Sequence, residues 1–200
     1  MKRVVLASGN AGKLKEMGEL LAGLDWQVLA QHALGVDDVP ETGLTFVENA
    51  LIKARHASAV TGLPALADDS GLIVDALGGA PGLYSARYAG EPGDAAANIA
   101  KLLDALHGVP AERRSARFYS VIVLLRHAED PQPLICEGRW EGRVLEAPRG
   151  AAGFGYDPVF LDPAHGLSAA QMPAGLKNAL SHRGMALREL LRKLAAQPAG

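Results

Sequence analysis

The residues best suited to chemistry begin in a short polar loop near the N-terminus. This loop consists of Ser8, Gly9, Asn10, Ala11, Gly12 and Lys13. It follows an apolar run over residues 3–7 and precedes leucines at helical spacing, so it joins a strand to a helix. Such a loop offers free backbone N–H groups, the positive helix end and the Lys13 ammonium to a phosphate. The pattern also fits an ordinary strand-to-helix turn, and it is not a Walker A loop because Gly9 and Gly12 are too close together.

Acidic residues form the second candidate group. Asp68 and Asp69 follow an apolar run over residues 65–67, and neighbouring side chains of an extended chain point to opposite sides. One aspartate can therefore face a pocket while the other holds the backbone. Together with Glu41, the pocket carboxylate offers the oxygen ligands that Mg²⁺ prefers. The alternative is an Asx-type turn in which Asp69 and Ser70 only end the strand.

Further candidates for substrate contacts lie on a predicted helix and in a loop. Lys53 follows Asn49 by one helical turn, so the two residues share a face that can look into the same cleft. A solvated lysine is the alternative interpretation. The loop contains Phe154, Gly155, Tyr156 and Asp157. Aromatic faces in such a loop suit stacking on a base, although they also suit simple packing.

Hydrogen-bond donors cluster before the last predicted helix. Lys177, His182 and Arg183 lie in this cluster, and Arg183 can donate to a carbonyl oxygen of a purine. A polar helix entry is the alternative. No serine lies in a GxSxG elbow and no GxGxxG fingerprint occurs, so the serine hydrolase and dinucleotide-binding classes have no support.

Composition excludes several other classes. The chain has 200 residues, 48% of them hydrophobic, and a formal net charge of −2 with dispersed cations, which predicts a globular protein with no nucleic acid partner. Charges interrupt every apolar run, so we expect no membrane partner. The single cysteine, Cys136, cannot form an intramolecular disulfide, which favours the cytoplasm. Histidine and cysteine spacing excludes a typical zinc site, so any metal must have oxygen ligands.

Hydrophobic periodicity predicts the elements that carry these residues. Strands are expected at residues 3–7, 26–30 and 65–67, with another apolar run at 72–77. Thr45 and Glu48 match a capping box for a helix that ends near residue 60. Asp94 is an N-cap for a helix that ends before Gly108. Residues 115–127 and 134–145 predict an antiparallel ribbon, and 185–195 a final helix. Alternating strands and helices with a long ribbon indicate one α/β domain over residues 1–200 with a mixed sheet.

Taken in order along the chain, these segments closely resemble the inosine triphosphate pyrophosphatase family. The matching pieces are Ser8-Gly9-Asn10 with Lys13, Glu41-Thr42-Gly43, Thr45-Phe46, Glu48-Asn49-Ala50, Ala67-Asp68-Asp69-Ser70-Gly71-Leu72, Pro81-Gly82, Tyr84-Ser85-Ala86-Arg87-Tyr88, Phe154-Gly155-Tyr156-Asp157-Pro158, Lys177-Asn178 and Ser181-His182-Arg183-Gly184. The match spans nearly the whole chain and its combination is specific. The chain departs from the family at Gln171, where a glutamate is frequent, and over residues 172–176.

The resemblance implies a two-lobed α/β fold on a long mixed sheet flanked by helices, an active-site cleft between the lobes and a homodimer. It also implies Mg²⁺ as the cofactor and a purine nucleoside triphosphate as the substrate. Asp69 would be the proton acceptor and a metal ligand, and Glu41 the other metal ligand. The loop from Ser8 to Lys13, together with Lys53 and Ser70, would bind the triphosphate. The base and sugar would be held by Phe154, Gly155, Tyr156, Asp157, Lys177, His182 and Arg183.

The implied reaction hydrolyses non-standard purine nucleoside triphosphates (ITP, dITP, XTP) to the monophosphate and pyrophosphate, which removes them from the nucleotide pool. Phosphoryl transfer requires mainly positioning and charge stabilisation, which explains a site of lysines, backbone amides and a metal without a covalent nucleophile. Two alternatives stay open. A triphosphate phosphohydrolase would release orthophosphate, and a nucleotide sensor would bind without turnover.

Overall fold

The structure is a computed structural model that describes residues 2–23 and 25–196. Its strands are β1 (Lys2–Ala7), β2 (Trp26–Ala30), β3 (Ala65–Val74), β4 (Ser115–Leu125), β5 (Leu134–Val144), β6 (Phe160–Asp162) and β7 (Leu167–Ser168). Its α-helices are α1 (Ala11–Leu21), α2 (Phe46–Thr61), α3 (Ala95–Ala105), α4 (Ala174–Leu180) and α5 (His182–Ala195). The predicted helices and strands are therefore present, with boundaries shifted by a few residues.

A mixed sheet organises the described part of the chain. Its 7 strands follow the order β2-β1-β3-β4-β5-β6-β7. β1 runs parallel to β2 and β3, whereas β6 is antiparallel to β5 and β7. The N–H of Val144, at the end of β5, donates to the carbonyl of Arg114, just before β4, at 2.9 Å, as the predicted antiparallel ribbon requires. The predicted α/β class with a mixed sheet is confirmed.

Contacts divide the fold into two compact units. Unit 1 comprises the described residues of Met1–Asp69, Ser120–Gly138 and Arg183–Gly200. Unit 2 comprises Ser70–Tyr119 and Arg139–His182. Each unit has its own hydrophobic core.

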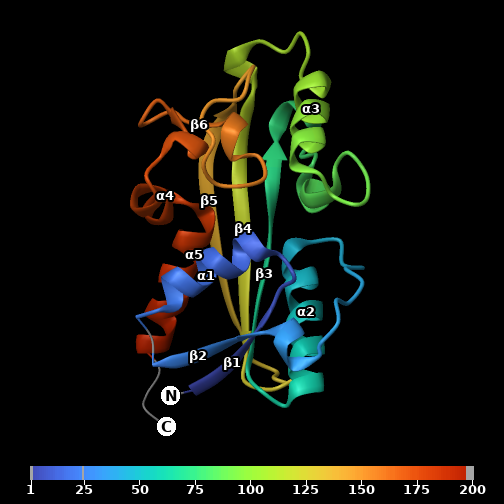
Figure 1. Ribbon diagram of the computed structural model, residues 1–200, viewed down its shortest axis with the longest axis vertical. Helices are drawn as coiled ribbons and strands as arrows, with labels where there is room; N and C mark the ends of the chain where they lie inside the picture. Colours follow the sequence, from blue (N-terminus) through green and yellow to red (C-terminus); the bar gives the residue numbers. More distant parts are fainter. Residues whose placement is uncertain (1, 24, 197–200) are drawn as a thin grey trace. The chain divides into compact units, whose positions relative to one another are not determined.

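Unit 1 buries both faces of its strands. In β1, Val4 and Leu6 join a core with Met17 of α1 and Leu187 of α5. The residues between them in β1 point the other way, where α2 presents small buried alanines (Ala50, Ala54 and Ala57). Figure 1 shows α2 on one side of these strands and α1 with α5 on the other. This packing holds the carboxyl ends of β1 and of the unit 1 part of β3 in place.

Unit 2 has an aromatic core. Phe118 lies between Phe160, at a ring centroid distance of 4.4 Å, and His182, whose ring stacks on it at 4.8 Å. Trp140 joins the same cluster, and its indole N–H donates to Asp162 at 2.7 Å. The buried indole nitrogen therefore has the hydrogen-bond partner that it needs.

The structure corrects one sequence prediction about the acidic pair. Asp68, Asp69 and Ser70 lie inside β3, which runs unbroken from Ala65 to Val74, and not in a loop between two apolar runs. The strand can continue through these residues because cationic and hydroxyl groups pair with the buried aspartate side chains. These partners offset the free-energy cost of removing the carboxylates from water.

Other element boundaries differ from the predicted ones because the local sequence pattern is weak there and tertiary packing determines where the element begins or ends. α5 begins at His182 and not at Met185. The short elements α4, β6 and β7 were not predicted. In the predicted capping box, Thr45 Oγ1 accepts from the Glu48 N–H at 3.3 Å, while the Glu48 carboxylate accepts from the Leu44 N–H at 2.8 Å.

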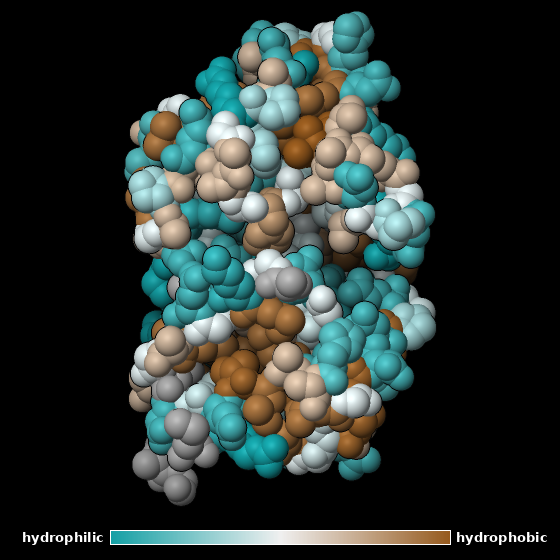
Figure 2. All heavy atoms as spheres, viewed as in Figure 1, coloured by the Kyte–Doolittle hydropathy of each residue, from teal (hydrophilic) through white to brown (hydrophobic). Residues whose placement is uncertain are grey.

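Figure 2 shows both hydrophilic and hydrophobic residues on the drawn face, and the hydrophobic ones gather most densely in the lower half of the view. Large exposed hydrophobic side chains in the described residues include Leu44, Val60 and Tyr84. Within those residues, no helix has the length and apolarity needed to cross a membrane.

Candidate active site

The N-terminal loop is fixed by its own side chains. Ser8 Oγ accepts a hydrogen bond from the Asn10 N–H at 3.2 Å, and Asn10 Oδ1 accepts from the Lys13 N–H at 3.1 Å. Asn10 is thereby the N-cap of α1, and Ala11, Gly12 and Lys13 form its first turn. The loop ends the parallel strand β1, which is where ligands bind in open α/β sheets.

Lys53 of α2 gathers the predicted acidic residues. Its Nζ lies 2.7 Å from Asp69 Oδ1 and 3.0 Å from Glu41 Oε1. The same ammonium donates to the backbone carbonyl of Asp68 at 3.0 Å. Glu41, Lys53 and Asp69, which are far apart in the sequence, therefore converge in unit 1.

Asp68 occupies a separate cationic environment. Asp68 Oδ2 lies 2.8 Å from Lys13 Nζ and accepts from Arg183 at 3.2 Å, while Ser120 Oγ donates to Asp68 Oδ1 at 2.5 Å. Arg183 also donates to Glu16. Asp68 and Asp69 thus bind different partners, as the alternation of side chains along a strand predicts.

Burial and charge separate the acidities of the two aspartates. Burial raises the pKa of the Asp69 carboxyl above its ordinary value, although the Lys53 and Lys13 ammonium groups oppose the rise. Burial would also raise the pKa of Asp68, but Arg183 and Lys13 reverse its effect and hold that pKa well below the usual range. Asp69 is therefore the better proton acceptor, and Asp68 is a fixed anion.

The two lysines also differ. Burial lowers the pKa of the Lys13 ammonium, and the nearby Asp68 carboxylate offsets only part of this effect. Burial would likewise lower the pKa of Lys53, but Asp69 and Glu41 reverse it and raise that pKa above its ordinary value. Lys53 therefore carries a secure positive charge between its two carboxylates.

A second group of predicted residues is organised around Asp157 in unit 2. Asp157 Oδ2 accepts from the Phe154 N–H at 2.8 Å and from Lys177 Nζ at 2.7 Å. The Lys177 ammonium also lies 5.0 Å from the centroid of the Phe154 ring. Gly153 has a φ of 78°, and a Cβ there would lie 2.1 Å from Asp157 Oδ2. Glycine is needed at this position on both grounds.

The aromatic pair of this loop divides into an exposed ring and a buried one. Phe154 is 38% exposed, whereas Tyr156 is 4% exposed and belongs to the core of unit 2. The Tyr156 hydroxyl donates to the Ser85 carbonyl at 2.9 Å. The exposed Phe154 ring is therefore the one suited to stacking on a base. The buried Tyr156 side chain anchors the loop through its hydrogen bond to Ser85.

The remaining predicted residues have mainly buried surroundings. The His182 ring stacks on Phe118 within unit 2. Ser70 lies in β3 and is partly buried. The guanidinium of Arg183 is directed to Asp68 and Glu16 in unit 1, so a contact of Arg183 with the base stays a prediction.

Sequence analysis assigned no role to several residues that form supporting hydrogen bonds to the site residues. Glu16 and Ser120 were not singled out, and Ser85 was quoted only within a motif and given no role, although each makes a buried or partly buried hydrogen bond in the site or beside its loop. Of these residues, only Glu16 could have been identified from its local sequence, since an acidic residue among the apolar positions of a predicted helix needs a charged partner. The serines carry no such signal, because their partners come from distant strands and loops.

Comparison with known proteins then places the chain. Residues 4–193 match the sequence profile of the Ham1 family. The chain belongs to the Ham1 family. A protein from Xanthomonas campestris pv. campestris (strain 8004) named dITP/XTP pyrophosphatase is 75% identical over 98% of both chains. One from Shigella flexneri with the same name is 58% identical, over 96% of this chain and 97% of the relative.

Solved structures of Ham1-family proteins share the fold. The HAM1 protein from Coxiella burnetii superposes with a TM-score of 0.91 at 52% identity, over 98% of this chain and 100% of that chain. A nucleoside-triphosphatase / dITP/XTP pyrophosphatase from Mycobacterium abscessus gives a TM-score of 0.76 at 44% identity, over 94% and 98% of the two chains. The resemblance inferred from the sequence motifs is confirmed.

Proposed function

We propose that this Ham1-family chain hydrolyses ITP, dITP and XTP to the nucleoside monophosphate and pyrophosphate. The observation that carries the proposal is the convergence of Lys53 with Asp69 and Glu41 in unit 1. Several bacterial relatives named dITP/XTP pyrophosphatase, which are 57–75% identical over nearly the full chain, support the substrate class. The function would remove non-standard purine nucleotides from the nucleotide pool.

Glu41 and Asp69 are the residues that would hold Mg²⁺. Among the described residues no group of three or more His, Cys, Asp or Glu side chains gathers as a metal site. Two carboxylates nevertheless fit Mg²⁺, which usually keeps several waters and binds substrate phosphates through one or two protein carboxylates. Both carboxylates already face one cation, the Lys53 ammonium. When bound, Mg²⁺ would neutralise phosphate oxygens.

Asp69 is the proton acceptor in this proposal. Its carboxylate orients a water and takes a proton as the water attacks the α-phosphorus, and pyrophosphate leaves. The raised pKa of Asp69 brings the carboxylate closer to the working pH and makes it a better base than an ordinary aspartate. Lys53 donates to Asp69 Oδ1 and so fixes the direction of the carboxylate.

The Ser8–Lys13 loop binds the triphosphate through backbone N–H groups at the start of α1 and through the Lys13 ammonium. Asp68 orients that ammonium. Lys13→Ala should weaken use of the triphosphate more than binding of the monophosphate product, because the β- and γ-phosphates are lost with pyrophosphate.

In unit 2, Phe154 and Lys177 are our candidates for binding the purine base. Phe154 is 38% exposed, and Asp157 holds both residues in place through hydrogen bonds. Lys177 and His182 are donors and favour a 6-oxo purine, whereas the 6-amino group of adenine is itself a donor. We further place the protein in the cytoplasm as a homodimer of one pyrophosphatase domain. The single cysteine, Cys136, is buried and not part of a disulfide, which is compatible with that compartment.

The test compares Asp69→Asn with the parent and with Asp104→Asn, an exposed aspartate of α3. We expect Asp69→Asn to lose nearly all turnover with ITP and to keep its fold by circular dichroism, while Asp104→Asn stays active. Product analysis should find pyrophosphate and no orthophosphate. Orthophosphate as the first product would support a phosphohydrolase, and no turnover of any triphosphate by the parent would support a sensor.

A further inference from the structure

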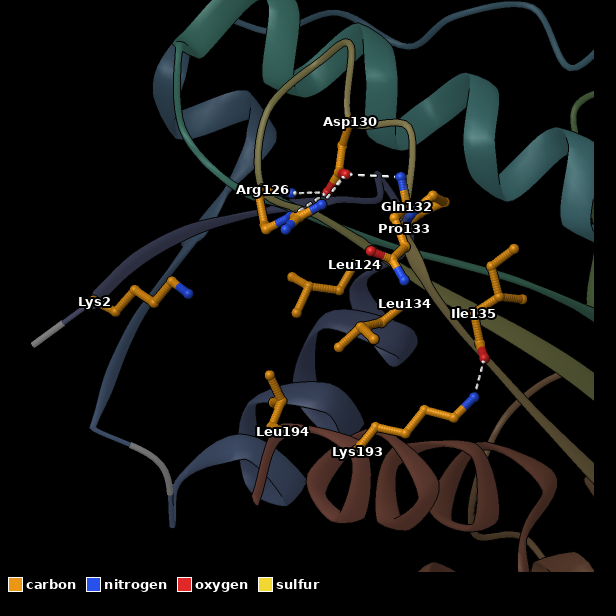
Figure 3. A pocket seen from close by; sticks show the side chains of 10 residues that line it. All are labelled: Lys2, Leu124, Arg126, Asp130, Gln132, Pro133, Leu134, Ile135, Lys193 and Leu194. Atoms are coloured by element: carbon orange, nitrogen blue, oxygen red, sulfur yellow. Dashed lines mark hydrogen bonds and ion pairs between the residues drawn. The ribbon is translucent and has the colours of Figure 1, made fainter. Parts of the chain in front are cut away.

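A cavity in unit 1 lies away from the residues assigned so far. It has a volume of about 350 Å³ and is lined by Lys2, Leu124, Arg126, Asp130, Gln132, Pro133, Leu134, Ile135, Lys193 and Leu194 (Figure 3). These residues come from the start of β1, the end of β4, the turn between β4 and β5, the start of β5 and the end of α5. The volume falls in the range of small-molecule sites.

The cavity is at the opposite end of β1 from the phosphate loop. Lys2 is the first residue of β1, and Ser8 directly follows its last residue. At about 3.3 Å per residue, roughly 20 Å separates the two positions along the strand. A ligand of this cavity is therefore not a substrate of the proposed catalytic cluster.

The floor of the cavity is apolar. Leu124 belongs to the buried core of unit 1, and Leu134 and Leu194 pack against that core. Figure 3 shows these three side chains together in the middle of the lining, with the polar groups around them. An apolar ligand body can cover this surface and remove it from water.

Two acceptor groups of the rim, the Asp130 carboxylate and the Ile135 carbonyl, already accept hydrogen bonds. Asp130 accepts from Arg126 Nε at 2.8 Å and from the Gln132 N–H at 2.9 Å. The Ile135 carbonyl accepts from Lys193 Nζ at 2.7 Å. The Arg126 hydrogen bond holds the pKa of Asp130 well below its usual range, so this carboxylate stays ionised and committed to its partners.

Donor groups of the rim keep capacity for a ligand. Lys2 has its ammonium 5.9 Å from the centroid of the Trp26 ring, and no described carboxylate lies within ion-pair distance of it. Gln132 is exposed, and its side-chain amide makes no hydrogen bond within the described residues. Lys193 adds a cation 3.6 Å from Glu189. The lining therefore offers donors and positive charge over an apolar floor.

We propose that this cavity binds a small amphipathic organic anion. Its apolar body would cover Leu124, Leu134 and Leu194, and its anionic group would meet Lys2 and the amide of Gln132. Charge complementarity selects an anion because the Asp130 carboxylate is already paired with Arg126, whereas the Lys2 ammonium has no described carboxylate within ion-pair distance. This proposal does not depend on the proposed catalytic function.

The experiment uses 8-anilinonaphthalene-1-sulfonate as the probe, because it joins aromatic rings to a sulfonate. Fluorescence titration of the folded parent should show one saturable site per chain. Lys2→Glu replaces attraction by repulsion and should weaken binding about tenfold or more. Lys15→Glu makes the same charge change on the exposed side of α1 and should leave binding within about twofold of the parent.

A second pair of variants tests the shape of the site. Gln132→Trp should obstruct the cavity and weaken binding about tenfold, because the indole has the volume to fill the space. Gln132→Ala removes only one hydrogen bond to the anion and should weaken binding about threefold. Excess inosine monophosphate should not displace the probe.

Three outcomes overturn the proposal. The first is the absence of one saturable site in the parent. The second is affinity that neither Lys2→Glu nor Gln132→Trp changes. The third is displacement by inosine monophosphate, which would place the probe in the catalytic cluster.

Discussion

Replacing Arg183 by alanine tests how the acidic part of the site is held. The guanidinium contacts Asp68 and Glu16, and the Arg183 side chain is 2% exposed. Its loss leaves two carboxylates in a buried environment without that cation. Breaking a buried ion pair by removing one partner costs about 3–5 kcal/mol. For a chain of this size, each kcal/mol lowers Tm by roughly 2–4 °C, so we expect Tm to fall by roughly 6–20 °C.

The pH dependence of this loss follows from Asp68. Arg183 and Lys13 hold its pKa well below the ordinary value, so the folded state gains stability at pH above that ordinary value. The parent loses this stability as the pH falls through the low folded pKa. The Arg183→Ala variant lacks part of this stability at neutral pH. The difference in unfolding free energy between parent and variant should therefore be largest near pH 7 and shrink below about pH 4.

The assay is urea and thermal unfolding of the parent, Arg183→Ala and Arg192→Ala at several pH values. Arg192 lies on the same helix, but its side chain is 69% exposed and pairs with Glu189 at the surface. Loss of that surface pair should leave the free energy of unfolding nearly unchanged, because solvent screens exposed charges. Adding Glu16→Gln to Arg183→Ala should recover part of the stability. A loss below about 1 kcal/mol for Arg183→Ala, or one that grows toward acid pH, would refute the reasoning.

Three further variants test the proton acceptor Asp69 and the loop around Asp157. Lys53→Gln removes a cation that opposes the raised pKa of Asp69, so the acid limb of kcat/KM should move to higher pH. An unmoved limb in the pH–rate profile would assign that limb to another group. Gly155→Ala, at a φ of 59° with open space around it, should cost about 1–2 kcal/mol in unfolding free energy. Gly153→Ala should cost at least about 1 kcal/mol more, because its Cβ would lie 2.1 Å from the Asp157 carboxylate. Equal losses in urea unfolding would count against that contact.

The sequence by itself determined the family and most of the regular elements. β2 has the predicted bounds because its apolar residues are flanked by turn residues. Thr45 and Asp94 cap α2 and α3 as predicted, since an N-cap needs only partners a few residues away. The motif residues also predict which side chains carry the chemistry, because their types and order can be read without knowledge of the fold.

Only the tertiary structure decided which partners each of those side chains pairs with and in which direction its pKa shifts. Asp68 and Asp69 are identical in type and adjacent in sequence, yet their pKa values shift in opposite directions. Burial acts on both carboxyls, but Arg183 and Lys13 outweigh it at Asp68, whereas Lys53 opposes it only in part at Asp69. Local periodicity carries no information about such partners, since long-range packing alone brings them within hydrogen-bond distance.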